Sequence, residues 1–361
     1  MKKYLISFYG EGMKGNDEFW IKRQEALNKT ALDTGNIDKV ISWNKEKLKT
    51  TGYWKRNRKV LDTEDGAGLW AWKSYIIFDL LCKINDGDVI IYYDVGSKDD
   101  NGYEINTAID PLIKWAIENN NGILTGFYRP DTMNKTYTKR DCFVYMGCDE
   151  EKYWDHPQNG ATYSIWQKNE LTMDIVTEWM TYSKDMRIIS DNKNKCGLDN
   201  LDGKKQKHRH DQSILTNLAI KYGLKCYPKT VGYGKNISSL IKMVEIDNFC
   251  LETFGFEFGD SLIEHLTEND IPNFSEKWEE LIKMFKFIKY DNPHHCFHPR
   301  DNVFITHTSF DKDKNYISYK NYNMEEFFNN INKMRNKSGK RLLDKMWNDL
   351  WWTGELKNVK L

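Results

Sequence analysis

The run Val89–Tyr93 (VIIYY) constrains the fold of this chain more than any other segment. All five residues are apolar or aromatic and the first three are β-branched, which predicts a strand covered on both faces. The strand ends abruptly at Asp94, within a longer stretch, Gly66–Ser97, that also predicts a glycine-bearing turn and an aromatic-rich helix. Open α/β sheets bind ligands at the carboxyl ends of their strands. Asp94 is therefore placed to bind a divalent cation or a ribose, which predicts a nucleotide site.

The first 230 residues alternate between strand and helix patterns. Strands are predicted where β-branched and aromatic residues gather in short runs: Tyr4–Tyr9, Lys39–Trp43, Val89–Tyr93, Gly122–Phe127 and Ala161–Gln167. Helices are predicted where apolar residues recur at helical spacing: residues 19–32, 74–84, 111–120, 139–145, 171–182 and 211–222. The polar stretches 51–65 and 191–209 are predicted to be exposed loops. This alternation predicts an α/β fold with a mainly parallel sheet and helices on both faces.

Residues 231–361 show mostly helical periodicity, clearest at Phe274–Lys289 and Met324–Trp352. We therefore expect two parts: residues 1–230 as a nucleotide-binding catalytic domain, and residues 231–361 as a mostly helical extension packed on it.

Composition narrows the possible partners and locations. Lys and Arg number 53, and so do Asp and Glu, so charge gives no reason to expect nucleic-acid binding. The seven cysteines are dispersed without a CxxC pair, as in reduced intracellular proteins. No apolar run reaches the roughly 20 residues of a membrane span, and the start of the chain lacks a signal-peptide core. We expect a cytoplasmic protein without an integral membrane segment.

A second polar focus, Lys207–Ser213 (KHRHDQS), falls where a helix is predicted to begin. A helix N-terminus favours anions through its free N–H groups and its dipole. Asp211 at this position can act on a sugar hydroxyl, or it can simply cap its helix. His208 or His210 can complete a metal shell beside Asp94, because imidazole is a common cation ligand. A loop histidine without such a role is the alternative.

Charged and aromatic residues elsewhere allow both functional and structural interpretations. Lys73 and Arg140 are candidate phosphate partners, although Lys73 can instead be solvated and Arg140 can form a surface ion pair with Asp141. Asp94 can be an ordinary turn aspartate after a strand. Trp70 and Trp72 fit core packing better than a sugar platform.

Three of these motifs, taken in order, resemble a group of GT-A-fold glycosyltransferases found in bacterial polysaccharide clusters and large DNA viruses. The matching segments are Gly-x-Gly-x-aromatic-x-Trp-Lys at 66–73, Gly-Asp-strand-Asp-x-Gly at 87–96 and His-Arg-His-Asp-Gln-Ser at 208–213. The resemblance spans about Lys3–Tyr227. It implies a GT-A (Rossmann-like) fold and transfer of a sugar from a UDP- or GDP-linked donor to a glycan, protein or lipid acceptor.

The resemblance also implies roles for individual residues. Asp211 and Gln212 would lie near the donor sugar as catalytic residues, and Asp94 with His210 would hold Mn²⁺ or Mg²⁺. The usual Asp-x-Asp is here Asp94-Val95-Gly96, so the second metal carboxylate is missing, and Ser74 stands where relatives often have proline. The implied nucleotide-sugar site comprises Ser7, Phe8, Tyr9, Gly10, Trp72, Lys73, Tyr93, Asp94, Arg140 and Asp141.

Other functions remain open from the sequence. A sugar nucleotidyltransferase would carry a basic glycine-rich loop after its first strand, whereas Gly10–Gly15 contains only Lys14. A catalytically inactive nucleotide- or sugar-binding module is compatible with the missing second aspartate. The segment 294–298 (HHCFH) has zinc-binding atoms but a spacing that fits a structural loop better.

Overall fold

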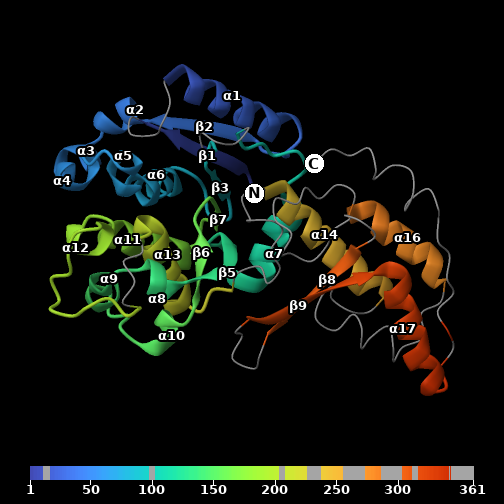
Figure 1. Cartoon of the computed structure of the whole chain (residues 1–361). Helices are drawn as coiled ribbons and strands as arrows, with labels where there is room; N and C mark the ends of the chain where they lie inside the picture. The colour runs from blue at the N-terminus through green and yellow to red at the C-terminus, as the bar shows by residue number, and fades with distance from the viewer. Residues whose placement is uncertain are drawn as a thin grey trace. The chain divides into compact units, whose positions relative to one another are not determined.

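A five-stranded sheet forms the centre of the first part of the chain in the computed structural model (Figure 1). Its strand order is β2 (Lys39–Asn44), β1 (Lys3–Tyr9), β3 (Val89–Tyr93), β7 (Tyr163–Gln167) and β4 (Ile123–Leu124). The first three strands are parallel, whereas β7 is antiparallel to both β3 and β4, so four of the five strands share one direction. The prediction of an α/β fold with a mainly parallel sheet is confirmed.

The structure describes residues 1–10, 17–96, 102–202, 208–225, 237–254, 273–285, 303–310, 316–340 and 342. The chain divides into two compact units, Met1–Pro228 and Lys229–Leu361. The glycine loop beyond Gly10, part of the stretch 191–209 and the 294–298 segment fall outside the described residues.

Both faces of the sheet are covered. Successive side chains of a strand point to opposite faces, and all five residues of β3 are buried, as are four successive residues of β1, Leu5–Phe8. Helix α1 (Asp17–Asp33) packs on β1 and β2, α6 (Trp72–Leu81) on β3, and α7 (Asp110–Asn120) on β4. Helix α11 (Glu170–Tyr182) packs on α6, and Asp94 directly follows the fully buried strand β3.

Shorter elements complete this unit. They are α2 (Lys45–Lys49), α3 (Gly52–Arg56), α4 (Arg58–Leu61), α5 (Gly66–Leu69), β5 (Phe127–Met133), α8 (Asn134–Tyr137), α9 (Arg140–Tyr145), α10 (Glu151–Trp154), β6 (Pro157–Gly160), α12 (Met186–Ile189) and α13 (His210–Lys221). Strands β5 and β6 form a separate antiparallel pair, and α13 packs on β6, α11 and α12.

The loop predicted at residues 51–65 is wrong over residues 52–61. Helices α3 and α4 occupy residues 52–61, where Tyr53, Trp54, Val60 and Leu61 are buried. The side chain of Thr51 caps α3 by accepting a hydrogen bond from the backbone N–H of Trp54. The basic run that suggested a loop, residues 55–59, lies between two apolar pairs, and burial of those pairs decides the outcome.

The strand predicted at Gly122–Phe127 divides into two. Ile123 and Leu124 pair with β7, whereas Phe127 begins β5 and pairs with β6. Gly126 lies between them with φ 107°, and a Cβ there would be only 1.8 Å from the carbonyl oxygen of Gly160. The close approach of two backbones therefore ends one strand and begins the other.

The second unit contains helices α14 (Ile237–Phe254), α16 (Phe274–Phe285) and α17 (Met324–Lys337). Strands β8 (Val303–Phe310) and β9 (Tyr316–Asn323) form an antiparallel hairpin that the sequence interpretation missed. The predicted helix Met324–Trp352 is confirmed only as far as Lys337. Among the described helices of the chain, none combines the length and apolar character needed to cross a bilayer.

Candidate functional site

A left-handed backbone turn precedes the helix that carries Lys73. Five consecutive residues, Gly66–Trp70, have positive φ angles between 54° and 109°. Three of them are not glycine, and each such residue costs roughly 1–2 kcal/mol in this conformation. Trp72 stabilises the turn because its indole N–H donates to the carbonyl oxygen of Gly66 (3.0 Å) and its ring stacks on Phe8 (3.7 Å between centroids). This strained turn connects Asp65 to the helix that carries Lys73.

Lys73 joins the end of β3 to the start of α13. Its ammonium nitrogen lies 2.9 Å from a carboxylate oxygen of Asp211 and 3.9 Å from one of Asp94. It also donates to the carbonyl oxygen of Ala161 (2.9 Å) and lies 4.9 Å from the ring centroid of Tyr92. We call the three residues Lys73, Asp94 and Asp211 the lysine cluster. The strand end and the distant helix start that the sequence singled out therefore meet at one cation.

Burial sets the electrostatics of the lysine cluster. The side chain of Lys73 is 3% exposed and that of Asp211 is 7% exposed, whereas that of Asp94 is 32% exposed. Burial alone would lower the pKa of Lys73, but the charges of Asp211 and Asp94 outweigh it and raise the pKa above its ordinary value. Lys73 is thus a buried ammonium ion that holds two carboxylates, not a solvated side chain.

Tyr92 contacts both Asp94 and Lys73 of the lysine cluster. Its hydroxyl donates a short hydrogen bond to Asp94, and burial, followed by the charge of Asp94, raises the pKa of Tyr92 well above its ordinary value. The phenol therefore remains a donor at neutral pH. One side of the Asp94 carboxylate is fixed by protein groups, and the partial exposure of this residue leaves it accessible to a ligand.

The side chains of the first three residues of α13 lie in three different environments. Successive helical residues are rotated by about 100°, so His210, Asp211 and Gln212 point in separate directions. Asp211 faces Lys73, and the N-cap residue is Arg209, which makes no side-chain cap hydrogen bond. The alternative in which Asp211 only caps its helix is therefore wrong.

Gln212 is oriented by a network of buried polar side chains. Its amide nitrogen donates to the side-chain oxygen of Gln158 (2.6 Å). Gln158 is fully buried and donates in turn to Thr138 (3.0 Å) and Ser213 (3.1 Å). Buried, fully bonded networks of this kind fix side-chain orientation, so Gln212 is presented in one orientation beside Asp211.

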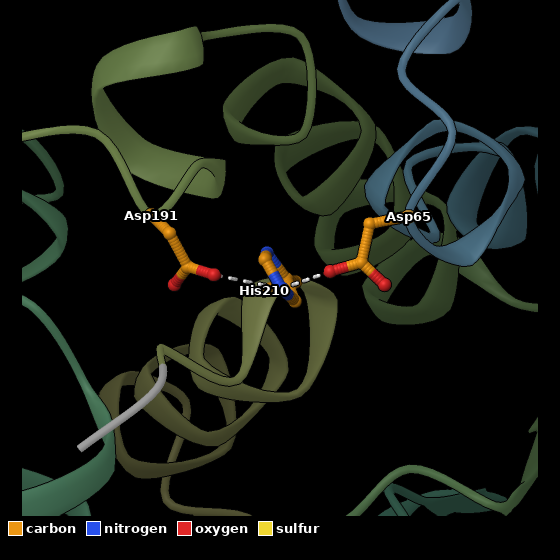
Figure 2. Close-up of side chains that lie close together, drawn as sticks. All are labelled: Asp65, Asp191 and His210. Carbon is orange, nitrogen blue, oxygen red and sulfur yellow. Dashed lines mark ion pairs between the residues drawn. The ribbon is translucent and has the colours of Figure 1, made fainter.

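His210 enters a second group of polar side chains, shown in Figure 2. Its Nε2 lies 3.6 Å from a carboxylate oxygen of Asp191 and 3.8 Å from one of Asp65. We call these three residues the histidine cluster. The metal prediction joined His210 to Asp94, but the structure places the imidazole beside Asp65 and Asp191 instead, because His210 and Asp211 are neighbours on a helix and cannot face the same side.

His208 has a structural role. Its Nε2 donates to the carbonyl oxygen of Ile188 (2.9 Å), and its Nδ1 accepts from the backbone N–H of Lys139 (3.3 Å). Burial, followed by the charges of His210 and Lys139, lowers the pKa of His208 well below its ordinary value. A neutral ring with both nitrogens bonded to backbone has no lone pair to offer a metal.

The predicted base cradle is largely part of the core. The hydroxyl of Ser7 accepts from the side chain of Gln24 (3.0 Å), and Phe8 stacks on Trp72. Gly10 is closely surrounded, since an added Cβ would lie 3.0 Å from the Phe8 ring. Tyr9 is half-buried, with its hydroxyl 3.4 Å from the side-chain nitrogen of Asn44. Of these four residues, Tyr9 therefore offers the most accessible side chain.

Tyr93 is also buried. It stacks on Tyr103 with 5.1 Å between ring centroids. Like Trp72, it supports the end of β3 from within the core and has no exposed ring face.

Arg140 and Asp141 organise their own surroundings. Arg140 pairs with Asp149 (2.9 Å) and lies over the ring of Trp154. Asp141 is fully buried and accepts from the backbone N–H groups of Lys195 and Cys196 (2.8 Å each). Burial would raise the pKa of Asp141, but these donors and Lys139 hold it below the usual value. Asp141 thereby anchors part of the segment 191–202.

Sequence reasoning missed three residues that shape the two clusters: Asp65, Tyr92 and Asp191. Asp65 directly precedes the Gly66–Lys73 motif and Asp191 begins the polar stretch before the histidines. Their positions beside recognised motifs were the available signal. Comparison with protein-family models, with curated proteins and with solved structures finds no match for this chain.

Proposed function

We propose that this chain is a GT-A-type glycosyltransferase that transfers a sugar from a UDP- or GDP-linked donor to a carbohydrate, protein or lipid acceptor. The observation that carries the proposal is the lysine cluster, in which a buried ammonium holds the carboxylate at the end of β3 beside the carboxylate at the start of α13. Carboxyl ends of strands at the centre of α/β sheets are ligand sites, and this one combines acidic groups with a helix N-terminus.

We propose different roles for the residues around the lysine cluster. Asp94 is the accessible carboxylate and is proposed to meet the donor through its ribose or its diphosphate. Asp211 and Gln212 are proposed to face the transferred sugar, with Gln158 fixing Gln212. The ammonium of Lys73 is already engaged by Asp211, Asp94 and the carbonyl oxygen of Ala161. Its proposed role is to fix the positions of the Asp94 and Asp211 carboxylates relative to each other, as a preorganised active site requires.

A divalent cation fits this place only in part. Asp94 is the partly exposed carboxylate of the lysine cluster, and the nearby ammonium of Lys73 opposes a second cation. Mg²⁺ and Mn²⁺ are commonly held by one or two carboxylates together with substrate phosphates, so Asp94 would hold the ion jointly with the donor. When bound, the ion would neutralise charge on the leaving diphosphate.

The test is donor hydrolysis by the full chain over a panel of UDP- and GDP-sugars, with Mn²⁺ or Mg²⁺ supplied. We expect one donor to be consumed and Asp94→Asn to lower the rate on the order of 100-fold, the usual effect of losing one aligned polar group in an active site. Because Asp94 is partly exposed, the melting temperature should change little. Asp79→Asn, in α6 and paired with exposed Lys83, is the matched control and should turn over normally.

Three results would reject this function. Absence of nucleotide binding by calorimetry would reject the site itself. Nucleotide binding without turnover of any donor would indicate a binding module. Release of pyrophosphate from a nucleoside triphosphate and a sugar phosphate would indicate a nucleotidyltransferase.

A further inference from the structure

The histidine cluster has a feature that separates it from an ordinary group of surface acids. His210 is 3% exposed, and in the part of the chain that the structure describes its buried Nε2 has no hydrogen-bond partner. This nitrogen points between the carboxylates of Asp65 and Asp191 (Figure 2). Buried polar atoms are nearly always bonded, so a buried ring nitrogen directed at two acids requires an explanation.

The ring tautomer can be assigned from the opposite nitrogen. Nδ1 lies 2.8 Å from the carbonyl oxygen of Ile189, and a carbonyl oxygen only accepts, so Nδ1 carries the hydrogen. In the neutral ring, Nε2 therefore presents a lone pair to the two carboxylates. Metal-binding histidines have the same arrangement, with the other ring nitrogen donating to a backbone carbonyl or a carboxylate. Trp70 stacks on the ring at 5.5 Å between centroids and limits its rotation.

The spacing fits an ion better than direct contacts. The distances from Nε2 to the acids, 3.6 and 3.8 Å, exceed the 2.7–3.2 Å of an N–H···O hydrogen bond. The three ligand atoms lie within 4.8 Å of one another. Ligands about 2.1 Å from a tetrahedral metal are separated by about 3.4 Å, so a small contraction would bring all three into coordination.

We propose that Asp65, Asp191 and His210 bind a divalent transition-metal cation, with Zn²⁺ preferred. Two carboxylates and a neutral imidazole carry a charge of −2, which a divalent cation balances. An imidazole ligand favours Zn²⁺ over Mg²⁺ or Ca²⁺, which prefer all-oxygen sites. The side chains of Asp65 and Asp191 are 44% and 42% exposed, so the ion can reach the site and retain a water molecule.

Such an ion would connect three separate segments. Asp65 precedes the left-handed turn, Asp191 follows α12, and His210 begins α13. The ion would thereby fix the helix start that also presents Asp211 and Gln212. The site itself is independent of the proposed transferase activity and can be tested without a substrate.

The experiment is titration of chelator-treated full-length protein with Zn²⁺ and Co²⁺, followed by calorimetry and by the visible absorption of Co²⁺. We expect one equivalent to bind, with Zn²⁺ tighter than Mn²⁺ and Mn²⁺ tighter than Mg²⁺. His210→Asn can retain the donor to Ile189 while removing Nε2, and it should weaken binding about 100-fold or more, because even outer partners of a metal ligand contribute 10–100-fold. Asp65→Asn and Asp191→Asn should weaken binding about 10-fold or more.

The matched control is Asp62→Asn, an aspartate of similar exposure (42%) that pairs with Arg58. It should bind Zn²⁺ as the wild type does. Equal binding by the triple variant D65N/D191N/H210N would overturn the proposal and place the metal elsewhere, as would equal affinity for Mg²⁺ and Zn²⁺. Absence of binding by the wild type would also overturn it. If H210N fails to fold, the two aspartate variants at partly exposed positions decide the question.

Discussion

The lysine cluster and the histidine cluster are built from neighbouring residues but differ in how their charges are balanced. Asp211 and His210 are adjacent on α13, and Lys73 and Asp65 lie on either side of the same left-handed turn. In the lysine cluster a buried ammonium already lies between the carboxylates. In the histidine cluster an imidazole nitrogen lies 3.6 and 3.8 Å from two partly exposed carboxylates and, within the described residues, has no hydrogen-bond partner.

This difference shows how one helix start serves two purposes. A rotation of about 100° per residue directs successive side chains of α13 into separate environments. In the lysine cluster an internal ammonium already pairs with both carboxylates, which suits the cluster to hold a fixed geometry. In the histidine cluster two carboxylates and an imidazole nitrogen converge, and this group is the one proposed to bind an added cation.

The largest effect is expected from removing the internal cation. Lys73→Met keeps the length of the side chain but leaves Asp211 buried without its counter-charge. Breaking a buried pair in this way costs about 3–5 kcal/mol of unfolding free energy. Urea unfolding at neutral pH, followed by tryptophan fluorescence, measures the change. Adding Asp211→Asn should restore part of the loss, because the unpaired charge is then removed as well.

Lys83→Met is the control for this substitution. Lys83 lies just after the same helix and pairs with Asp79, but its side chain is 63% exposed. An exposed pair contributes about 0–1 kcal/mol, so this variant should unfold almost as the wild type does. Equal losses for the two lysine variants would show that the lysine cluster is no more charge-dependent than the surface, and the contrast between the two clusters would fail.

An intermediate effect is expected in the turn that links the clusters. Gly66→Ala would place a Cβ 2.2 Å from the ring of Trp70, at φ 59°. Trp70 stacks on His210, so the clash should also disturb the histidine cluster. Gly87→Ala is the control, because Gly87 has φ 81° but no heavy atom within 4 Å of an added Cβ. We expect G66A to lose about 1–3 kcal/mol more than G87A, the usual effect of overpacking.

Thermal unfolding of the two glycine variants under identical conditions measures this difference. The metal affinity of G66A, measured with Co²⁺, should fall as well, while that of G87A stays at the wild-type value. Equal stability of the two variants would mean that the Trp70 ring moves freely, and the turn would then not define the position of either cluster.

The sequence predicted the sheet far better than the side-chain geometry at its edge. The runs Tyr4–Tyr9 and Val89–Tyr93 are short, apolar and β-branched, and the structure contains β1 and β3 at nearly the same bounds. Local pattern is enough there because burial on both faces leaves a strand few alternatives. Local pattern also predicted the strand end at Asp94 and the helix start near Asp211, whereas their common location near a donor was implied by the resemblance; in the structure both contact Lys73.

The partners of His210 could not be predicted in the same way. His210 and Asp211 appear as one motif in the sequence, and only their rotation on the helix separates their partners. The left-handed turn is equally hidden, because Ala67, Leu69 and Trp70 adopt positive φ angles that their residue types disfavour. Long-range packing decides both features, so the sequence identified the motif but not the pairing of its members.

The smallest effect concerns two histidines that differ in how many ring nitrogens the protein uses. Both nitrogens of His208 are bonded to backbone groups, and burial lowers its pKa well below the ordinary value. Above about pH 6.5 the ring is neutral in both the folded and the unfolded chain, and it adds no pH dependence. Below about pH 6.5 the unfolded chain takes up a proton that the folded chain excludes. Stability should therefore fall, by up to about 1.4 kcal/mol per pH unit.

The measurement is the unfolding free energy of the wild type and of His208→Asn between pH 7.5 and 5.5. Other groups titrate in both proteins, so the quantity of interest is the difference between the two curves. The curves should run parallel above about pH 7, which serves as the internal control, and the wild type should lose stability faster below about pH 6.5. Parallel curves throughout would mean that His208 can take up its proton in the folded state. The hydrogen bonds to the backbone of Ile188 and Lys139 would then not hold the His208 ring in its neutral form. The proposed difference between His208, with both ring nitrogens bonded, and His210 would fail.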